Sequence, residues 1–261
     1  MLVHTRIRRP GARRWWRCLG ILIFLLGLPA WSAPLKIDLF DGLSNGSLAD
    51  GQFGWSRSEK DSAQPEWWVK YQAPETGASY LEIFQDVWGN GPNLTVTREL
   101  RVDEGLKSWQ IDGRLKVVNG PENSIYLRVF DNQGRAIASL DRFTLNHKQG
   151  KRGPGDSYLT FNGTPIIPKA RDKEQWKAVM LFTNEAWKPF RITWSAEKPE
   201  LLTLTYGERT VEAPVPDGVQ ASSPKKLQLF LGWGLGAQGK GALLLEGLTI
   251  TAERMDKAVQ R

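Results

Sequence analysis

A glycine-rich run near the C-terminus has the spacing of nucleotide-binding motifs. Residues 234–239 read GLGAQG and match G-x-G-x-x-G, and residues 234–240 match most of a P-loop. Such glycines bind phosphate where a helix follows them, because the anion lies at the helix N-terminus. Here residues 242–252 have the pattern of a strand, and Gly241 stands where a P-loop has Ser or Thr. The run therefore predicts a turn between two strands and no nucleotide ligand.

Several tryptophans stand beside polar residues in expected loops and strand ends. Trp88 lies between Asp86 and Asn90, and Trp187 and Trp233 border small or polar residues. A sugar ring stacks its apolar face on an aromatic plane, while its hydroxyls bond to Asp, Asn, Gln or Arg. These five residues are therefore the predicted glycan-binding residues, with closure of the sandwich ends as the alternative role. The other tryptophans after residue 33 are expected in the core (Trp109, Trp176, Trp194) or at strand ends (Trp55, Trp67, Trp68).

Few residues could ligate a metal. Cys18 is the only cysteine, and His147 is the only histidine after residue 33. Zinc and copper sites need several such ligands, and a Ser-His-Asp triad would depend on His147. Calcium stays open because it takes oxygen ligands alone, and Asp38 and Asp41 are its candidates, with turn formation as their alternative role. The sequence predicts no other cofactor.

Residues 1–33 have the composition of a targeting segment. Residues 18–29 form an apolar run after a basic stretch, and Ala30 and Ser32 place small residues before a cleavage site at Ala33. The run is shorter than the roughly 20 residues of a bilayer-spanning helix. We expect a signal peptide and a periplasmic or secreted protein of a bacterial envelope. An uncleaved N-terminal anchor is the alternative, and it would be the only contact with the membrane.

The targeting segment accounts for most of the net charge. The chain has a formal net charge of +7, and six arginines of the segment supply most of it: Arg6, Arg8, Arg9, Arg13, Arg14 and Arg17. The remaining chain is therefore about +1, which gives no reason to expect a nucleic-acid partner. It also lacks cysteine, so a hydrophobic core and no disulfide must hold it together.

Short strands separated by turn residues recur along the rest of the chain. Residues 94–102 alternate with Arg98 as the one polar residue on the apolar face, and DNQG at 131–134 is a hairpin turn. No repeat or linker divides residues 34–253, and 254–261 form a charged tail; short helices are expected only at 172–176 and in the tail. The prediction is one all-β domain, an antiparallel β-sandwich or jelly roll. Its expected strands are 80–87, 94–102, 109–118, 124–130, 135–143, 176–182, 189–195, 201–206, 226–232 and 242–252, with a tight turn after Tyr206.

Five stretches of the sequence resemble concanavalin A-like lectin/glucanase and laminin G-like domains. They are FDGLSNGSLADGQFGW (40–55), WKPFRITW (187–194), LLTLTYGERTV (201–211), KLQLFLGWG (226–234) and LLLEGLTITAE (243–253). The resemblance implies a concanavalin A-like sandwich over most of residues 36–253 and a glycan or polysaccharide as the partner. It specifies the fold more than the activity.

The resemblance also raises the question of catalysis. Glu82 and Asp86 would be about 13 Å apart on one strand, beyond the ~5–9.5 Å that glycoside hydrolysis needs. TRELR (97–101) and QID (110–112) are similar to strands of family 7 alginate lyases. The first two positions are exchanged, Asp112 replaces the catalytic histidine, and the tyrosine motif is missing. Glu82, Asp86, Glu99 and Arg101 remain the catalytic candidates if the protein is an enzyme.

Three functions follow from these observations. The first is an exported, non-catalytic protein that binds carbohydrate through a lectin-like sandwich. The second is a polysaccharide lyase or glycoside hydrolase of the same fold with degenerate motifs. The third is a structural envelope protein that binds another protein.

Overall fold

The computed structural model describes residues 33–47, 53–57, 67–88, 94–118, 123–143, 158–167, 186–233 and 238–255. The chain divides into two compact units, Met1–Ala33 and Pro34–Arg261, and the second contains nearly all of the described residues. Sixteen strands and no helix occur in these residues. Within the described part, no helix is long and apolar enough to cross a membrane. The expected strand at 176–182 and helix at 172–176 lie outside it.

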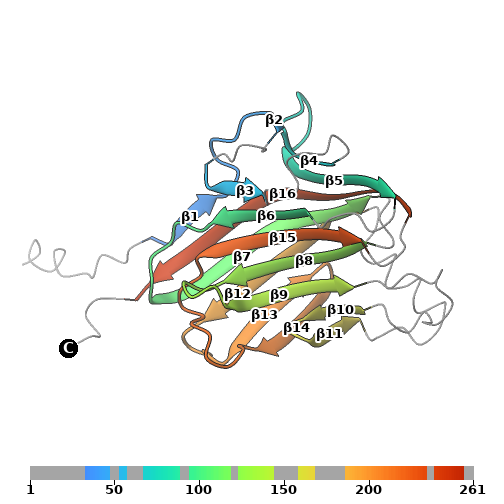
Figure 1. The fold of residues 1–261 in the computed structure, drawn as a ribbon. Helices are drawn as coiled ribbons and strands as arrows, with labels where there is room; N and C mark the ends of the chain where they lie inside the picture. Colours follow the sequence, from blue (N-terminus) through green and yellow to red (C-terminus); the bar gives the residue numbers. More distant parts are fainter. Residues whose placement is uncertain are drawn as a thin grey trace, which may run out of the picture. The chain divides into compact units, whose positions relative to one another are not determined.

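The strands form two antiparallel sheets (Figure 1). The nine-stranded sheet has the order β14 (Arg209–Pro214), β13 (Leu201–Tyr206), β12 (Lys188–Ser195), β7 (Leu106–Val118), β16 (Gln238–Arg254), β5 (Tyr80–Trp88), β4 (Trp67–Gln72) and β2 (Gly46–Ser47), with β1 (Leu35–Asp38) also paired to β16. The seven-stranded sheet has the order β11 (Thr164–Ile167), β10 (Tyr158–Phe161), β9 (Ala136–Phe143), β8 (Asn123–Phe130), β15 (Lys226–Trp233), β6 (Leu94–Glu99) and β3 (Trp55–Arg57). The predicted all-β antiparallel sandwich is confirmed.

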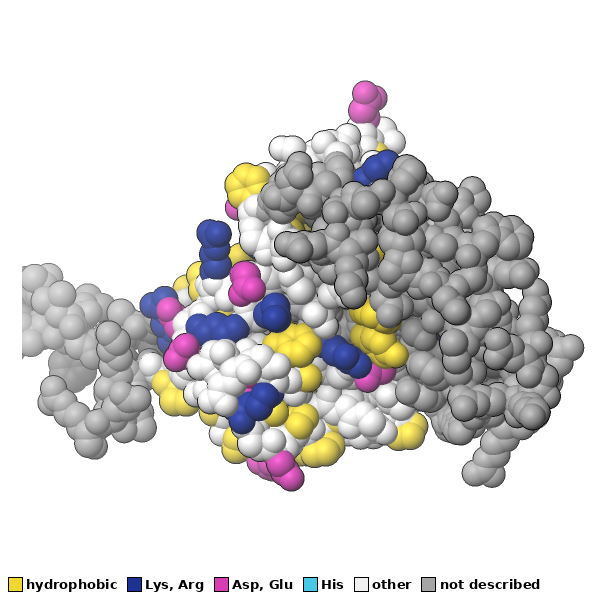
Figure 2. Space-filling model, in the orientation of Figure 1, with side chains coloured by type: hydrophobic (Ala, Val, Ile, Leu, Met, Phe, Trp, Pro, Cys, Tyr) yellow, Lys and Arg dark blue, Asp and Glu magenta, His cyan; other side chains and the backbone are white. Residues whose placement is uncertain are grey.

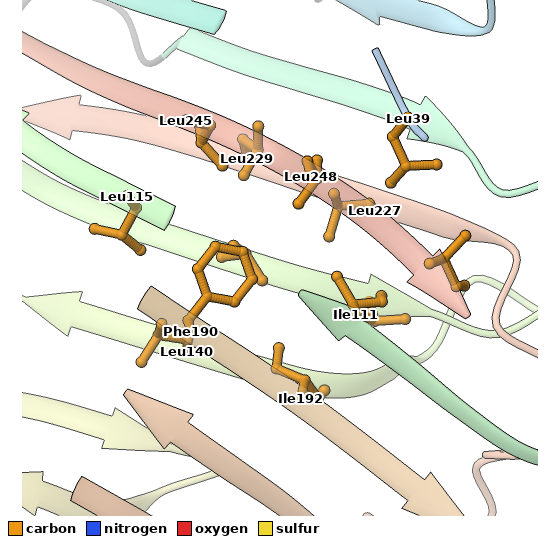
Figure 3. Close-up of a cluster of buried hydrophobic side chains, with 14 of the residues drawn as sticks. Leu39, Ile111, Leu115, Leu140, Phe190, Ile192, Leu227, Leu229, Leu245 and Leu248 are labelled. Carbon is orange, nitrogen blue, oxygen red and sulfur yellow. The ribbon is translucent and has the colours of Figure 1, made fainter. Parts of the chain in front are cut away.

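The core follows from the alternation of side chains along each strand. In the nine-stranded sheet the register places Ile192, Ile111 and Ile250 side by side, and all three are buried. In the seven-stranded sheet Leu229 is opposite both Val96 and Leu127. Figure 3 shows side chains from both sheets, among them Ile111, Ile192, Leu227 and Leu229, gathered in one cluster. The two inner faces thus share a single core, as in an aligned sandwich.

Most expected strands are confirmed, with small differences at their ends. Every second residue from Leu94 to Val102 is buried, including Arg98, although β6 itself ends at Glu99. The Asp131 hairpin joins β8 to β9, and Gly207 begins the turn between β13 and β14. β16 runs through Arg254, the first residue of the expected charged tail, and residues 256–261 lie outside the described part. The sequence did not indicate β1 to β4, β10 or β11.

Two tryptophans expected in the core are confirmed, and a third, expected at a strand end, is buried as well. Trp109 and Trp194 are buried, and their indole N–H groups donate to the carbonyls of Ala221 and Pro199. Trp55 is also buried, and its Nε1 donates to the carbonyl of Leu39 at 2.8 Å. Trp55 begins β3, as expected for a strand end, but it cannot stack on a sugar, because its ring fills the core and its one polar atom is satisfied.

Candidate functional site

The outer face of the nine-stranded sheet brings polar and aromatic residues together from four strands. Along β7, every second side chain points into the core and the ones between point outward. Gln110, Asp112 and Arg114 therefore lie on the outer face, each about 6.6–6.8 Å along the strand from the next. The register sets Arg191 opposite Asp112, and Glu246 opposite Arg114. The antiparallel pairing of β7 with β12 and β16 therefore builds the cluster that no single strand contains.

Asp112 is at the centre of the first part of this cluster. Its Oδ1 accepts a hydrogen bond from Arg191 Nε at 2.6 Å, and its Oδ2 accepts one from Gln110 Nε2 at 2.5 Å. Arg191 is 56% exposed and Asp112 27% exposed, so the pair is open to solvent. Because its Nε is fixed, the guanidinium presents its remaining N–H donors beside the carboxylate.

Two hollows flank Asp112 and Arg191. One has a volume of about 260 Å³ and is lined by Asp112, Gly113, Pro189, Phe190, Arg191 and Thr205. The other has a volume of about 330 Å³, and its polar lining includes Gln110, Thr193, Thr203, Glu212, Thr251 and Glu253. Both are open depressions between the same strands, β7, β12 and β13, and they carry hydroxyl, amide and carboxylate groups. The face is therefore hollowed where its polar side chains gather.

An aromatic group closes the other end of the cluster. Trp187, directly before β12, is partly exposed; the Arg114 guanidinium lies 5.6 Å from the centre of its ring. Tyr80 meets the same ring edge-on, with 6.4 Å between centroids. Arg114 also donates to Glu246 at 2.9 Å, and Glu246 is opposite Tyr80 in the register. We call the set Asp112, Arg191, Gln110, Arg114, Glu246, Trp187 and Tyr80 the outer-face cluster.

The predicted glycan-binding residues are only partly brought together. Trp187 belongs to the outer-face cluster. Trp88 and Asp86 lie at the end of β5 in the same sheet, whereas Trp233 ends β15 of the other sheet. The side chains of Trp88, Asp86 and Trp233, and the whole of Asn90, lie outside the described residues.

The catalytic candidates are divided between the two sheets. Glu82 is on β5 of the nine-stranded sheet, where its carboxylate accepts a hydrogen bond from Gln72 Nε2 at 3.2 Å. Glu99 ends β6 of the seven-stranded sheet and is exposed, and Arg101 follows it. The structure therefore places Glu82 and Glu99 in different sheets, with Arg101 two residues beyond the end of β6.

The calcium candidates lie at a turn near the start of the domain. Asp38 Oδ1 accepts a hydrogen bond from the backbone N–H of Phe40 at 2.8 Å, and the backbone N–H of Asp41 donates to the Asp38 carbonyl. These bonds are typical of a carboxylate that shapes a turn. No group of three acidic, His or Cys residues suited to a metal occurs among the described residues.

The glycine-rich run connects the two sheets. Residues 234–237 lie outside the described part, between the end of β15 and the start of β16. β15 belongs to the seven-stranded sheet and β16 to the nine-stranded sheet. A 17-residue strand follows the glycines where a dinucleotide site needs a helix.

Two buried polar residues lie between the sheets, away from the outer face. Arg142 and Tyr206 line a narrow space with aliphatic side chains such as Leu115 and Leu159. Burial lowers the pKa of Arg142 to about 10, although the nearby Tyr206 hydroxyl opposes this shift. Burial also raises the pKa of Tyr206 well above its usual value. These groups belong to the core of the sandwich.

Most of the outer-face cluster was not predicted from the sequence. Tyr80, Arg114, Arg191 and Glu246 were not predicted as site residues, and Gln110 and Asp112 were noted only for a resemblance to a lyase strand. Each occupies an outward position of an expected strand, which is a common place for a charged residue. The signal that distinguishes them is their register, and the register depends on pairings between distant strands.

Two packed antiparallel sheets with a polar and aromatic outer face define the class, a β-sandwich of the jelly-roll kind. No known protein family matches the sequence, and no curated protein does. Similar solved structures include the Emp47p carbohydrate recognition domain, at 10% identity and a TM-score of 0.45 over 88% of this chain and 100% of that chain.

Two enzymes are also among the similar structures. A glycoside hydrolase family 16 endo-glucanase from Bacteroides ovatus has 10% identity and a TM-score of 0.46 over 83% of this chain and 99% of that one. The alginate lyase Aly36B has 7% identity and a TM-score of 0.45 over 87% and 100%. The antiparallel β-sandwich that the resemblance implied is present in the two sheets of the structure.

Proposed function

We propose that this protein is an exported, non-catalytic β-sandwich that binds carbohydrate on the outer face of its nine-stranded sheet. The observation that carries the proposal is the outer-face cluster itself. A partly exposed Trp187, flanked by Arg114 and Tyr80, lies on the same face as the Asp112–Arg191 pair and its hollows.

The chemistry of the cluster matches that of a sugar. A pyranose presents C–H groups on one face, which pack on an aromatic ring, and hydroxyls at its edge. Those hydroxyls both donate and accept, so they need a mixture of carboxylate, amide and guanidinium groups. The outer-face cluster supplies all three, and the adjoining hollows add the hydroxyls of Thr193, Thr203 and Thr205.

The state of the carboxylates favours binding over catalysis. Glu246 accepts from Arg114, Asp112 accepts from Arg191 and Gln110, and Glu82 accepts from Gln72. A general acid or base has to exchange a proton with the substrate, which competes with such bonds. Carboxylates held by fixed neighbours are better suited to accept hydrogen bonds from hydroxyls.

The proposal of export rests on the targeting segment at residues 1–33 and on the absence of cysteine after it. The ligand would then be an envelope or extracellular polysaccharide, which such a protein meets after export.

Affinity electrophoresis through gels containing a panel of polysaccharides tests the proposal. We expect one or more polysaccharides to retard the protein, and Trp187→Ala to weaken retention about tenfold, roughly 1.4 kcal/mol. Arg254→Gln is the control, because Arg254 is an exposed residue at the end of β16 that pairs with Asp103.

Three results would each contradict a part of the proposal. Absence of retardation by every polysaccharide would remove the binding function. Release of reducing ends or unsaturated products from any polysaccharide would show that the protein is an enzyme of this fold. Retardation that Trp187→Ala leaves unchanged would move the site away from the outer face.

A further inference from the structure

We propose that the ligand of the outer face is an uncharged polysaccharide, recognised through adjacent hydroxyls by the Asp112–Arg191 pair. This inference rests on the proposed carbohydrate-binding function. It follows from how the charges on this face are arranged, and it names a ligand class that the fold does not specify.

The cations of the outer face are matched by carboxylates. Arg191 pairs with Asp112 at 2.6 Å and Arg114 with Glu246 at 2.9 Å. Lys107 lies 4.0 Å from Glu253. The two arginines most suited to bind an anionic group are therefore already bonded to carboxylates of the protein.

The remaining charges of this face also balance. Lys70 is opposite Glu82 in the β4–β5 register. Among the described outward side chains of the nine-stranded sheet there are as many carboxylates (Asp38, Glu82, Asp112, Glu212, Glu246, Glu253) as cations (Lys36, Lys70, Lys107, Arg114, Lys116, Arg191). Figure 2 shows the side of the molecule on which β8, β9 and β15 of the seven-stranded sheet lie in front (Figure 1); basic and acidic side chains are interspersed on that side as well.

A polyanionic chain would gain little binding free energy on a surface whose charges balance. Binding a polyanion is favoured by an excess of positive charge, which attracts the chain and releases its counterions. Here a carboxylate or sulfate that approached Arg191 would also come close to Asp112, and like charges at short distance repel. Removal of Arg191 from Asp112 would in turn leave that carboxylate without its strongest partner.

The same arrangement suits two neighbouring hydroxyls. Each oxygen of Asp112 accepts one bond from the protein, which leaves further lone pairs to accept from a hydroxyl. Arg191 bonds through Nε, and its terminal N–H groups can donate to the hydroxyl next to it. A donor and an acceptor are thus held side by side on one strand pair, at the edge of the 260 Å³ hollow.

Affinity gels run over a range of salt concentrations test this inference. The panel contains neutral β-glucans, mannans and xylan, together with alginate, polygalacturonate and dextran sulfate. We expect a neutral polysaccharide to retard the protein, with a change of less than about twofold between low and high salt. Binding through ion pairs would instead fall steeply with salt. Retention by the acidic polymers alone, lost at high salt, would overturn the inference and leave carbohydrate binding intact.

A charge-neutralising variant gives a second, independent test. Asp112→Asn removes one negative charge and frees Arg191. We expect it to weaken binding of the neutral polysaccharide about tenfold, because the fixed donor and acceptor are lost. If the true ligand were acidic, the same variant would strengthen binding, since it exposes an unpaired cation. If Asp112→Asn fails to fold, Glu246→Gln in the second ion pair distinguishes the two ligands in the same way, by whether binding weakens or strengthens. Arg254→Gln is the control for both variants. No retention of the unaltered protein by any polymer would instead refute the proposed function.

Discussion

At the residue scale, Asp131 shows how one turn residue holds two distant segments. Its side chain is fully buried. Oδ1 accepts from the backbone N–H groups of Gln133 and Arg135, each at 2.9 Å. Oδ2 accepts from Arg135 Nε at 2.9 Å and from the backbone N–H of Gln220 at 3.3 Å. The hairpin turn that the sequence indicated is thereby fastened to the loop that precedes β15.

We expect Asp131→Asn to lower the free energy of unfolding at pH 7 by about 1–3 kcal/mol, because hydrogen bonds to a charged carboxylate are lost. Urea denaturation followed by circular dichroism measures the change. Asp217→Asn, at an exposed loop position, is the matched control. An effect no larger than that of the control would show that the Asp131 charge does not stabilise the fold.

The contribution of Asp131 also depends on pH. Burial raises its pKa, but the hydrogen bonds from Arg135, Gln220 and Gln133 lower it by a larger amount. The pKa of Asp131 therefore lies below the ordinary value of 3.8. The stabilisation is therefore complete above about pH 3.8 and is lost as the pH falls through the lower, folded-state pKa. The difference between the unaltered protein and Asp131→Asn should shrink only in this acidic range. A difference that already disappears near pH 5 would contradict the assignment.

At the element scale, the β10–β11 hairpin depends on two residues with positive φ. Asn162 has φ 46° and Gly163 has φ 79°, the combination that a two-residue hairpin turn requires. Asn162 also accepts from the backbone N–H of Ser139 at 2.7 Å and donates to the carbonyls of Ile137 and Pro214. The turn therefore joins its own hairpin to β9 and to the end of β14.

We expect Gly163→Ala to destabilise the protein by about 1 kcal/mol, since an alanine is strained at this φ. Asn162→Gly keeps the backbone freedom and removes the three side-chain bonds, so it separates the two contributions. Thermal denaturation of both variants measures them. If Gly163→Ala has no effect, the turn is not the strained type described, and if Asn162→Gly has none, its side-chain bonds do not stabilise the domain.

The same hairpin shows how far the elements could be predicted from the sequence. Long strands with clear alternation, such as β6, β7 and β12, were predicted because an apolar face repeats every two residues. The Asn162–Gly163 pair is a strong hairpin signal, but β10 and β11 were not predicted from it. In contrast, β2 and β3 contain two and three residues, too few for any period to show, and they form because longer neighbours offer them an edge.

At the scale of the whole molecule, the candidate site could be predicted only in part. Trp187 was predicted as a site residue because it borders small or polar residues in the sequence. Its partners Arg114 and Tyr80 belong to β7 and β5, and β16 lies between those strands. A shift of one residue in any of these pairings would turn Arg114 or Glu246 toward the core. The register that prevents this is set by the packing of the whole core, which the local sequence does not contain.

Because the two sheets share one core, we expect the domain to unfold in a single transition. Trp55 lies in the seven-stranded sheet, and Trp109 and Trp194 lie in the nine-stranded sheet; all three are buried. Tryptophan fluorescence and far-ultraviolet circular dichroism should therefore give the same midpoint in urea.

Leu229→Ala, at a fully buried position of β15, should lower both midpoints together and cost about 2–5 kcal/mol. Leu35→Ala, at a partly exposed position of β1, should change them little. Midpoints that separate in Leu229→Ala would show that the sheets unfold independently, and the outer face would then not depend on the seven-stranded sheet for its register.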